Sequence, residues 1–253
     1  MGPYATATLC LGLQPSGRYG QLLASTARSI STLARSERSK KRALKKPILS
    51  LVLDHPSVQR LGPETLTEVL RAGVDWIQLR DRSLEGKDWF HWAQEMGRLA
   101  HSVRPDLVVL INRRVDVALA SGAQGTHLGF DSVAPQTARN LLGPRSRIGL
   151  STHTAEEALT ASAEDIDYVH LAPIFDPLSK PRERKALGLK PLRSATSGEL
   201  PIIAQGGLAA GGCTEALRAG ATGIAVTGTV TEAQNPGATT AALRAELDAF
   251  CDK

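Results

Sequence analysis

The segment PIIAQGGLAAGGCTEALRAGATGIAVTGTV, residues 201–230, contains two apolar runs that each end in glycine. The runs PIIAQGG (201–207) and GIAVTG (223–228) have the length of buried strands. The stretch between them has helical spacing and reaches Gly220, a residue type that commonly ends helices. This segment therefore predicts two consecutive strand–helix units of a parallel α/β fold.

The same alternation of strand and helix extends back to residue 48. Eight strand–helix units predict an α/β protein built as a single (β/α)₈ TIM barrel. A doubly wound open sheet is the alternative, but no GxGxxG motif follows the first strand. Thr65 and Thr154 look like helix starts, and Gly73 and Gly122 like helix ends. The six earlier strands are predicted at ILSLVLD (48–54), WIQLRD (76–81), LVVLIN (107–112), GTHLG (125–129), RIGLST (147–152) and YVHLAPI (168–174).

The net charge of +5 is unevenly distributed along the 253 residues. Residues 1–46 carry a net charge of +8, and residues 47–253 carry a net charge of −3. The first segment resembles an organelle transit peptide or a solvated basic tail, and an upstream start codon chosen in error is a third possibility. We expect the barrel to span 47–253 and to bind no nucleic acid, because its own charge is mildly acidic.

Cysteine content and hydropathy indicate the cellular environment. The cysteines Cys10, Cys213 and Cys251 show no paired or metal-type spacing, which favours a reducing compartment without disulfides. No apolar run approaches the ~18–20 residues of a membrane span. We therefore expect a cytoplasmic protein without membrane contact, or an imported one if the leader is a transit peptide. The oligomeric state stays open, and a homo-oligomer is possible.

In a TIM barrel, functional groups gather where the strands end. The glycine turns after the last two predicted strands suggest a phosphate site built from backbone N–H groups, although they could also serve tight turns only. We predict phosphate binding by four residues: Gly206, Gly207, Gly228 and Thr229.

Histidines at strand ends are candidates for acid–base chemistry. His153 follows the fifth predicted strand and could transfer a proton, or it could instead cap the next helix. His127 fits a buried structural position, and His170 fits an interior histidine with its hydrogen bonds satisfied. His153 is therefore the predicted catalytic residue.

Seven collinear motifs make the chain similar to a known superfamily. Over about residues 48–245 the sequence resembles the thiamine phosphate synthase and thiazole tautomerase (TenI-type) superfamily. The motifs are WIQLRDRS, INRRVDVALASGAQGTHLG, IGLSTHTAEEA, DYVHLAPIF, GLKPL, PIIAQGGL and AGATGIAVTG.

The resemblance implies one of two activities. Synthases join a pyrimidine diphosphate to a thiazole phosphate and use Mg²⁺, whereas tautomerases aromatise a carboxythiazole phosphate without metal. Arg113 and Ser132 occupy positions where synthases place metal-binding aspartates, and Arg82 replaces a lysine. This pattern favours the metal-independent tautomerase, an isomerase of thiamine biosynthesis that needs no cofactor. Ser179 and Lys180 retain part of a synthase loop, and an arginine can also neutralise diphosphate directly.

The synthase, a Mg²⁺-dependent transferase, is therefore kept as an alternative, as is a non-catalytic ligand-binding relative. A sugar-phosphate isomerase outside the superfamily would need another strand-end carboxylate, and only Asp54 offers one. In the tautomerase hypothesis, His153 moves the proton of a bound thiazole phosphate, and Arg80 and Arg113 hold its carboxylate. The predicted substrate-binding residues are Gln78, Arg80, Asn112, Arg113 and Lys180.

Two further pairs of residues are expected to be structural. Arg114 and Asp116 should form a local ion pair near a helix start. Trp89 and Trp92 lie three residues apart on a predicted helix and should pack against the barrel.

Overall fold

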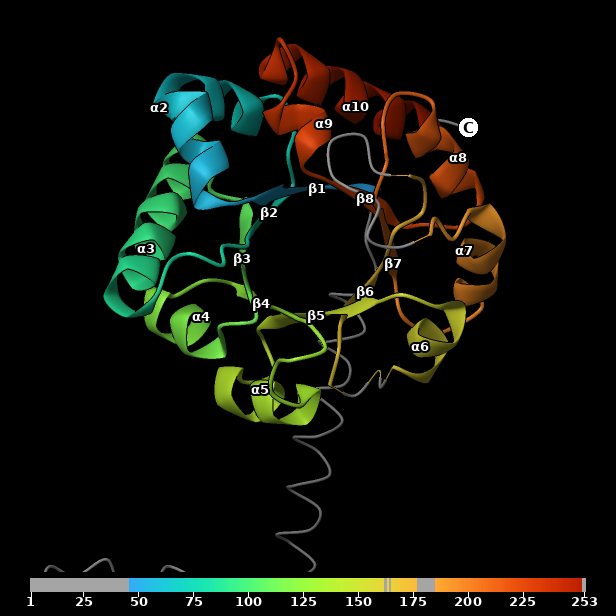
Figure 1. Cartoon of the computed structure of the whole chain (residues 1–253), viewed down its shortest axis with the longest axis horizontal. Helices are drawn as coiled ribbons and strands as arrows, with labels where there is room; N and C mark the ends of the chain where they lie inside the picture. The colour runs from blue at the N-terminus through green and yellow to red at the C-terminus, as the bar shows by residue number, and fades with distance from the viewer. Residues whose placement is uncertain (1–45, 162, 164, 177–184, 252–253) are drawn as a thin grey trace, which may run out of the picture.

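The chain forms a closed barrel of eight parallel strands surrounded by helices. The computed structural model describes residues 46–161, 163, 165–176 and 185–251. The strands follow one another around the barrel in chain order, and β8 closes on β1 (Figure 1). Every neighbouring pair is parallel, as a right-handed strand–helix–strand repeat requires. The predicted TIM barrel is confirmed.

The strands fall within the predicted segments, but most of them are shorter. Only the strand at 147–152 has the predicted length. Most of the other segments continue into the loop that follows the strand, whereas the segment at 107–112 begins one residue before its strand. The strands are β1 (Ile48–Leu53), β2 (Trp76–Leu79), β3 (Val108–Asn112), β4 (Gly125–Leu128), β5 (Arg147–Thr152), β6 (Tyr168–Leu171), β7 (Ile202–Gln205) and β8 (Gly223–Val226).

The helices cover the outside of the barrel. Thr154 caps its helix as predicted, since its hydroxyl accepts the Glu157 N–H at 3.0 Å. The helices are α2 (His55–Arg71), α3 (Gly86–Val103), α4 (Val115–Ser121), α5 (Pro135–Leu142), α6 (Ala155–Thr160), α7 (Leu189–Ala195), α8 (Gly212–Arg218), α9 (Gly228–Thr231) and α10 (Pro236–Cys251).

The predicted start of the first barrel helix at Thr65 is wrong. Helix α2 begins ten residues earlier, where the Asp54 carboxylate accepts the Ser57 N–H at 2.8 Å. A kink at Gly62, whose φ is +70°, divides the helix. Gly62 and Pro63 precede Thr65, and both residue types interrupt helices, so local sequence does not show that one helix continues across them.

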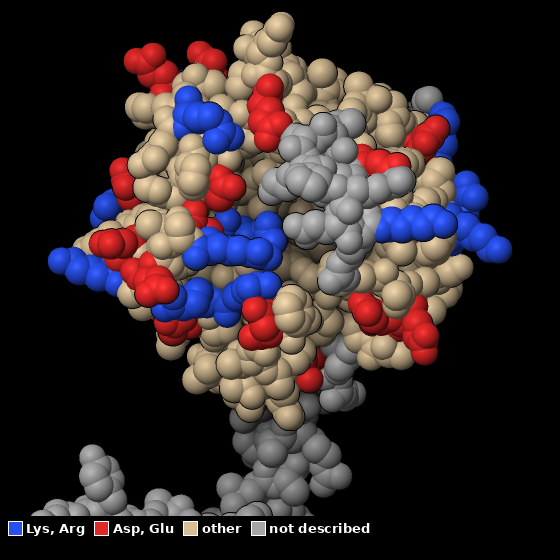
Figure 2. Space-filling model, viewed as in Figure 1, with Lys and Arg blue, Asp and Glu red and all other residues tan. Residues whose placement is uncertain are grey.

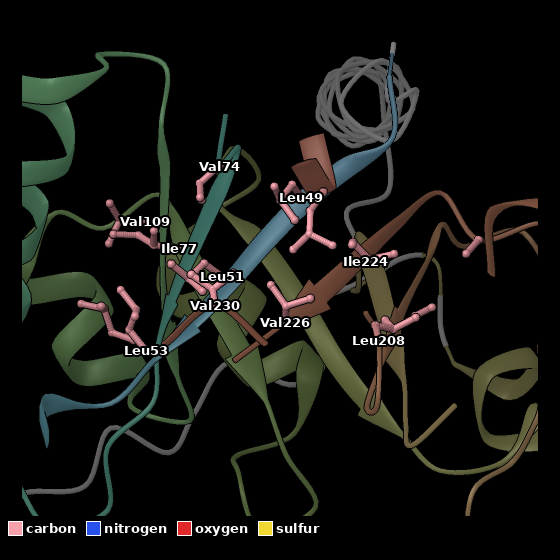
Figure 3. Packing of buried hydrophobic residues seen from close by; sticks show 14 of the residues in the cluster. Leu49, Leu51, Leu53, Val74, Ile77, Val109, Leu208, Ile224, Val226 and Val230 are labelled. Carbon is pink, nitrogen blue, oxygen red and sulfur yellow. The ribbon is translucent and has the colours of Figure 1, made fainter. Parts of the chain in front are cut away.

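Alternating residues of each strand build two apolar layers. Leu49, Leu51 and Leu53 of β1 point away from the barrel axis and pack beneath the helices, together with Ile77 and Ile224 (Figure 3). The residues between them face inward. The barrel interior is filled by a separate cluster: Ile48, Val52, Trp76, Leu110, Tyr168, Ile203 and Ala225.

Two buried ion pairs fasten the end of the barrel where the strands begin. The Asp75 carboxylate accepts the Leu49 N–H and contacts the Arg244 guanidinium at 2.8 Å. Asp167 repeats the arrangement, because it accepts the Ile148 N–H and contacts Arg139 at 2.8 Å. Each carboxylate precedes one strand and binds the backbone of its neighbour, which leaves the opposite end of the barrel for a site.

Several other sequence predictions can be compared with the described residues. Arg114 and Asp116 form the expected ion pair at 2.6 Å. Trp89 and Trp92 are buried, with ring centroids 5.1 Å apart. Among the described helices, none is both long and apolar enough to cross a lipid bilayer. Residues 1–45, which hold nearly all of the predicted leader, lie outside the described residues, so the division at residue 46 stays a prediction.

Candidate active site

A cavity of about 630 Å³ opens at the carboxyl ends of the barrel strands. It is lined by strand ends and following loops from β1 to β8, the location at which TIM barrels carry their sites. Nine predicted site residues line it: Gln78, Arg80, Asn112, Arg113, His153, Gly206, Gly207, Gly228 and Thr229. Lys180, the remaining predicted binding residue, lies outside the described residues.

Amide side chains from β2 and β3 form one polar wall of the cavity. The Gln78 amide nitrogen donates to the Asn112 side-chain oxygen at 2.9 Å. Gln78 itself is buried, and among the described residues its side-chain oxygen has no hydrogen-bond partner. A buried acceptor of this kind is costly unless a ligand or water supplies a donor. Gln78 therefore brings an unpartnered acceptor to the lining of the cavity.

His153 sits beside the cavity with a defined tautomer. Its Nδ1 lies 2.8 Å from the Ala172 carbonyl oxygen, which can only accept, so Nδ1 carries the proton. Its backbone N–H donates to the Glu157 carboxylate. In the neutral ring Nε2 is then the acceptor, and it can receive a hydrogen bond from a ligand.

Two buried histidines form the polar floor beneath the cavity. His127 is 3.1 Å from the Tyr168 hydroxyl and 2.9 Å from the Ser151 hydroxyl. Burial lowers the pKa of His127 well below its usual value, and the nearby charges of His170 and Arg80 lower it further. His127 thus occupies the buried structural position that the sequence predicted.

His170 differs from its predicted role as a fully satisfied interior histidine. Its Nδ1 is 3.0 Å from the Gln205 side-chain oxygen, but its Nε2 has no partner among the described residues. Both His170 and Gln205 line the cavity. Sequence reasoning missed Ser151 and Gln205, although the inward alternation of β5 and β7 could have identified them.

The glycine loops after β7 and β8 have a structural requirement of their own. Gly206 and Gly207 have φ values of +94° and +64°, a region that side chains rarely adopt. A Cβ atom on Gly207 would lie 2.3 Å from the Asp176 carbonyl oxygen. The Thr229 hydroxyl donates to the Leu208 carbonyl oxygen at 2.6 Å and so ties the two loops together. Tight packing explains these glycines, and phosphate binding by them stays a prediction.

Three arginines of the described chain line the other side of the cavity: Arg80, Arg82 and Arg113. They come from the segments that follow β2 and β3. In Figure 2, basic side chains gather beside the centre of the barrel, over the β2–β4 side of Figure 1. This positive wall suits an anionic ligand.

The residues present do not fit a magnesium ion. Mg²⁺ requires several oxygen ligands, usually carboxylates and phosphates. No three His, Cys, Asp or Glu side chains of the described residues meet in a metal-binding group. Arg113 contacts Asp131 at 2.8 Å, and the Ser132 hydroxyl accepts the Gly129 N–H at 2.9 Å. Asp131, the acidic neighbour of Ser132, is thus paired with the guanidinium that stands at the other metal position.

Comparison with known proteins gives consistent results. A relative from Chlorobium phaeovibrioides named thiamine-phosphate synthase is 35% identical over 205 residues, which cover 80% of this chain and 95% of that protein. A second, from Roseiflexus sp., has the same name and is 35% identical over 76% of this chain and 83% of its own length. A solved thiamine phosphate pyrophosphorylase from Pyrococcus furiosus has a TM-score of 0.70 and 28% identity, and the match covers 80% of this chain and 96% of that chain.

These names correct the predicted activity. The expected thiazole tautomerase, an isomerase, is wrong, because the proteins that match most of the chain are named thiamine-phosphate synthase or thiamine phosphate pyrophosphorylase. The prediction depended on Arg113 and Ser132, which stand where synthases place metal-binding aspartates. Residues at metal positions do not by themselves define the reaction. The family model described as thiamine monophosphate synthase (TMP-TENI) matches residues 49–230, nearly the whole barrel. The chain therefore belongs to the thiamine monophosphate synthase family.

Proposed function

We propose that the protein is a thiamine-phosphate synthase, a transferase of thiamine biosynthesis. In that reaction a pyrimidine diphosphate is joined to a thiazole phosphate, and diphosphate is released. The proposal is supported by the relatives of that name and by one feature of the cavity. An arginine wall and a pair of glycine-rich loops lie on separate parts of its rim, a placement that suits two anionic substrates.

The first surface is the arginine wall after β2 and β3. Arg80 and Arg113 can donate paired N–H groups to diphosphate oxygens, a geometry that guanidinium groups suit better than ammonium groups. As the bond between the pyrimidine methylene carbon and the diphosphate oxygen breaks, the electron pair leaves with the diphosphate. Fixed positive charge at this wall stabilises the negative charge that develops there.

The second surface consists of the loops after β7 and β8. Gly206 and Gly207 allow the backbone to come close to a ligand, and Gly228 begins the short helix α9. These loops would hold the phosphate of the thiazole and direct its ring nitrogen toward the methylene carbon, where the new C–N bond forms. Holding both substrates in one cavity supplies the orientation that such a two-substrate reaction needs.

Polar side chains between the two surfaces would bind the heteroaromatic rings. The Gln78 side-chain oxygen and the His153 Nε2 are acceptors that face the cavity region. An aminopyrimidine can satisfy such acceptors with its N–H groups. In this proposal His153 contacts the substrate. Its predicted role as the base belonged to the tautomerisation, which the comparisons contradict.

Complementation tests the proposal in cells. A bacterium that lacks its own thiamine-phosphate synthase should grow without added thiamine when it expresses this protein. Arg80→Ala should fail to support growth, because it removes a cation from the arginine wall. Arg193→Ala, which changes an exposed arginine on α7, is the matched control and should support growth. Failure of the unaltered protein, when it is expressed in folded form, would contradict the proposal.

A further inference from the structure

Arg113 is held at the cavity rim in an unusual backbone conformation. It is the first residue after β3 and has a φ of +64°, the one positive value among the described residues other than glycine. Its N–H donates to the His127 carbonyl oxygen at 2.8 Å, which fixes the turn against β4. A long charged side chain in this conformation is uncommon, so the surrounding structure must specify it.

The contacts of the Arg113 side chain leave it able to bind an anion. One guanidinium nitrogen contacts Asp131 at 2.8 Å, and the group lies 5.6 Å from the centre of the Phe130 ring. The side chains of Arg113 and Asp131 are 29% and 43% exposed. An ion pair this open is weak, and a guanidinium has further N–H groups to donate. Asp131 can therefore orient Arg113 without consuming its capacity for a ligand.

The Asp side chains that line the cavity accept hydrogen bonds from nearby backbone N–H groups. Asp54 caps α2 through the Ser57 N–H. Asp81 accepts hydrogen bonds from the backbone of His55, Ser83 and Leu84 and from the Ser83 hydroxyl. Burial alone would raise the pKa of Asp81, but these hydrogen bonds outweigh it and lower the pKa. Hydrogen bonds to local backbone therefore already occupy oxygens of both carboxylates.

We propose that Arg113, together with Arg80 and Arg82, binds the diphosphate group directly and takes the place of a divalent cation. This inference rests on the proposed function, since diphosphate is the leaving group of that reaction. A guanidinium supplies positive charge and N–H donors to the phosphate oxygens, where a metal ion would supply positive charge and coordinate those oxygens. The pocket then binds diphosphate without metal, in contrast to the Mg²⁺ requirement that resemblance to the synthases would imply.

Calorimetric titration of the full-length protein with inorganic pyrophosphate tests this proposal. Binding should be measurable in EDTA and should not strengthen when Mg²⁺ is added. Because Mg²⁺ complexes pyrophosphate in solution, added metal should if anything weaken the apparent affinity. Binding that is absent in EDTA and appears only with Mg²⁺ would overturn the proposal.

Variants at residue 113 identify the cation responsible. Asn and Asp tolerate positive φ better than most residues, so Arg113→Asn and Arg113→Asp should retain the fold. Arg113→Asn should weaken pyrophosphate binding in EDTA roughly 10- to 100-fold, the value of hydrogen bonds to a charged group. Arg113→Asp should weaken it further, and Arg113→Lys should restore part of it. Arg193→Asn is the control, and melting temperatures verify folding.

The possible outcomes separate this inference from the proposed function. Unchanged pyrophosphate binding in folded Arg113→Asn and Arg113→Asp would overturn the role of Arg113. Metal-free binding without any synthesis of thiamine phosphate would contradict the proposed function and leave the anion site intact. Synthesis of thiamine phosphate that depends on Mg²⁺ would support the proposed function and overturn the inference that arginines replace the metal.

Discussion

At the scale of single residues, buried histidines couple the stability of the barrel to pH. Burial lowers the pKa of His170 to about 4 from the ordinary value of 6.5. The unfolded chain therefore takes up a proton below about pH 6.5, while the folded protein resists protonation until about pH 4. The stability contributed by the neutral ring is fully present above pH 6.5. It is lost as the pH falls through this window, by at most ~1.4 kcal/mol per pH unit.

A substitution at His170 tests this coupling. Urea unfolding measured between pH 4 and pH 7 should show a smaller loss of unfolding free energy on acidification for His170→Gln than for the unaltered protein. His91→Gln, which changes an exposed histidine on α3, is the control. Part of the pH dependence should remain, because His127 is also buried with a lowered pKa. Identical slopes for His170→Gln and the unaltered protein would contradict this account.

The sequence identified most of the residues around the cavity but not what each one contacts. Strand ends of a barrel converge, so Gln78, Asn112 and Arg113 could be placed there from position alone. The missing partner of His170 could not be foreseen, since it depends on how side chains from β4, β6 and β7 fill the interior. The activity was misjudged because a substitution at a metal position was interpreted as a change of reaction.

At the scale of elements, helix α10 is fastened to the first two strands by a buried ion pair. The Arg244 guanidinium contacts Asp75, and both side chains are 9% exposed. Removal of one partner of a buried pair leaves an uncompensated charge and costs ~3–5 kcal/mol. Asp75→Ala should lower the unfolding free energy by about this amount, as measured by urea denaturation.

The same arginine provides its own control. Arg244 also contacts Asp248 at 2.8 Å, but Asp248 is 55% exposed. Exposed pairs contribute ~0–1 kcal/mol, so Asp248→Ala should have a small effect. Equal destabilisation by the two substitutions would show that burial does not determine the contribution of this ion pair.

The order of strands and helices could be predicted from the sequence, whereas their first and last residues were predicted less accurately. Apolar runs and intervening helical spacing defined all eight strands, and Thr154 was identified as a helix cap. The start of α2 was missed because Asp54 was considered only as a strand-end functional group. Its carboxylate instead caps the helix, a role that local sequence does not separate from catalysis.

At the scale of the whole molecule, the barrel should fold without the basic N-terminal segment. Lys46 contacts Asp75 at 2.8 Å, and all eight strands lie after it. A chain that begins at Lys46 should therefore keep the melting temperature and pyrophosphate affinity of the full-length protein. A large decrease in melting temperature, followed by thermal denaturation, would show that residues 1–45 contribute to the fold.

The central claim is that this barrel joins two anionic substrates into thiamine phosphate. The most direct measurement is the formation of thiamine phosphate by the purified protein from the pyrimidine diphosphate and the thiazole phosphate, with diphosphate release followed in parallel. We predict one diphosphate released for each thiamine phosphate formed, and no product when either substrate is omitted. The absence of thiamine phosphate from folded protein, both in EDTA and with Mg²⁺ added, would contradict the account.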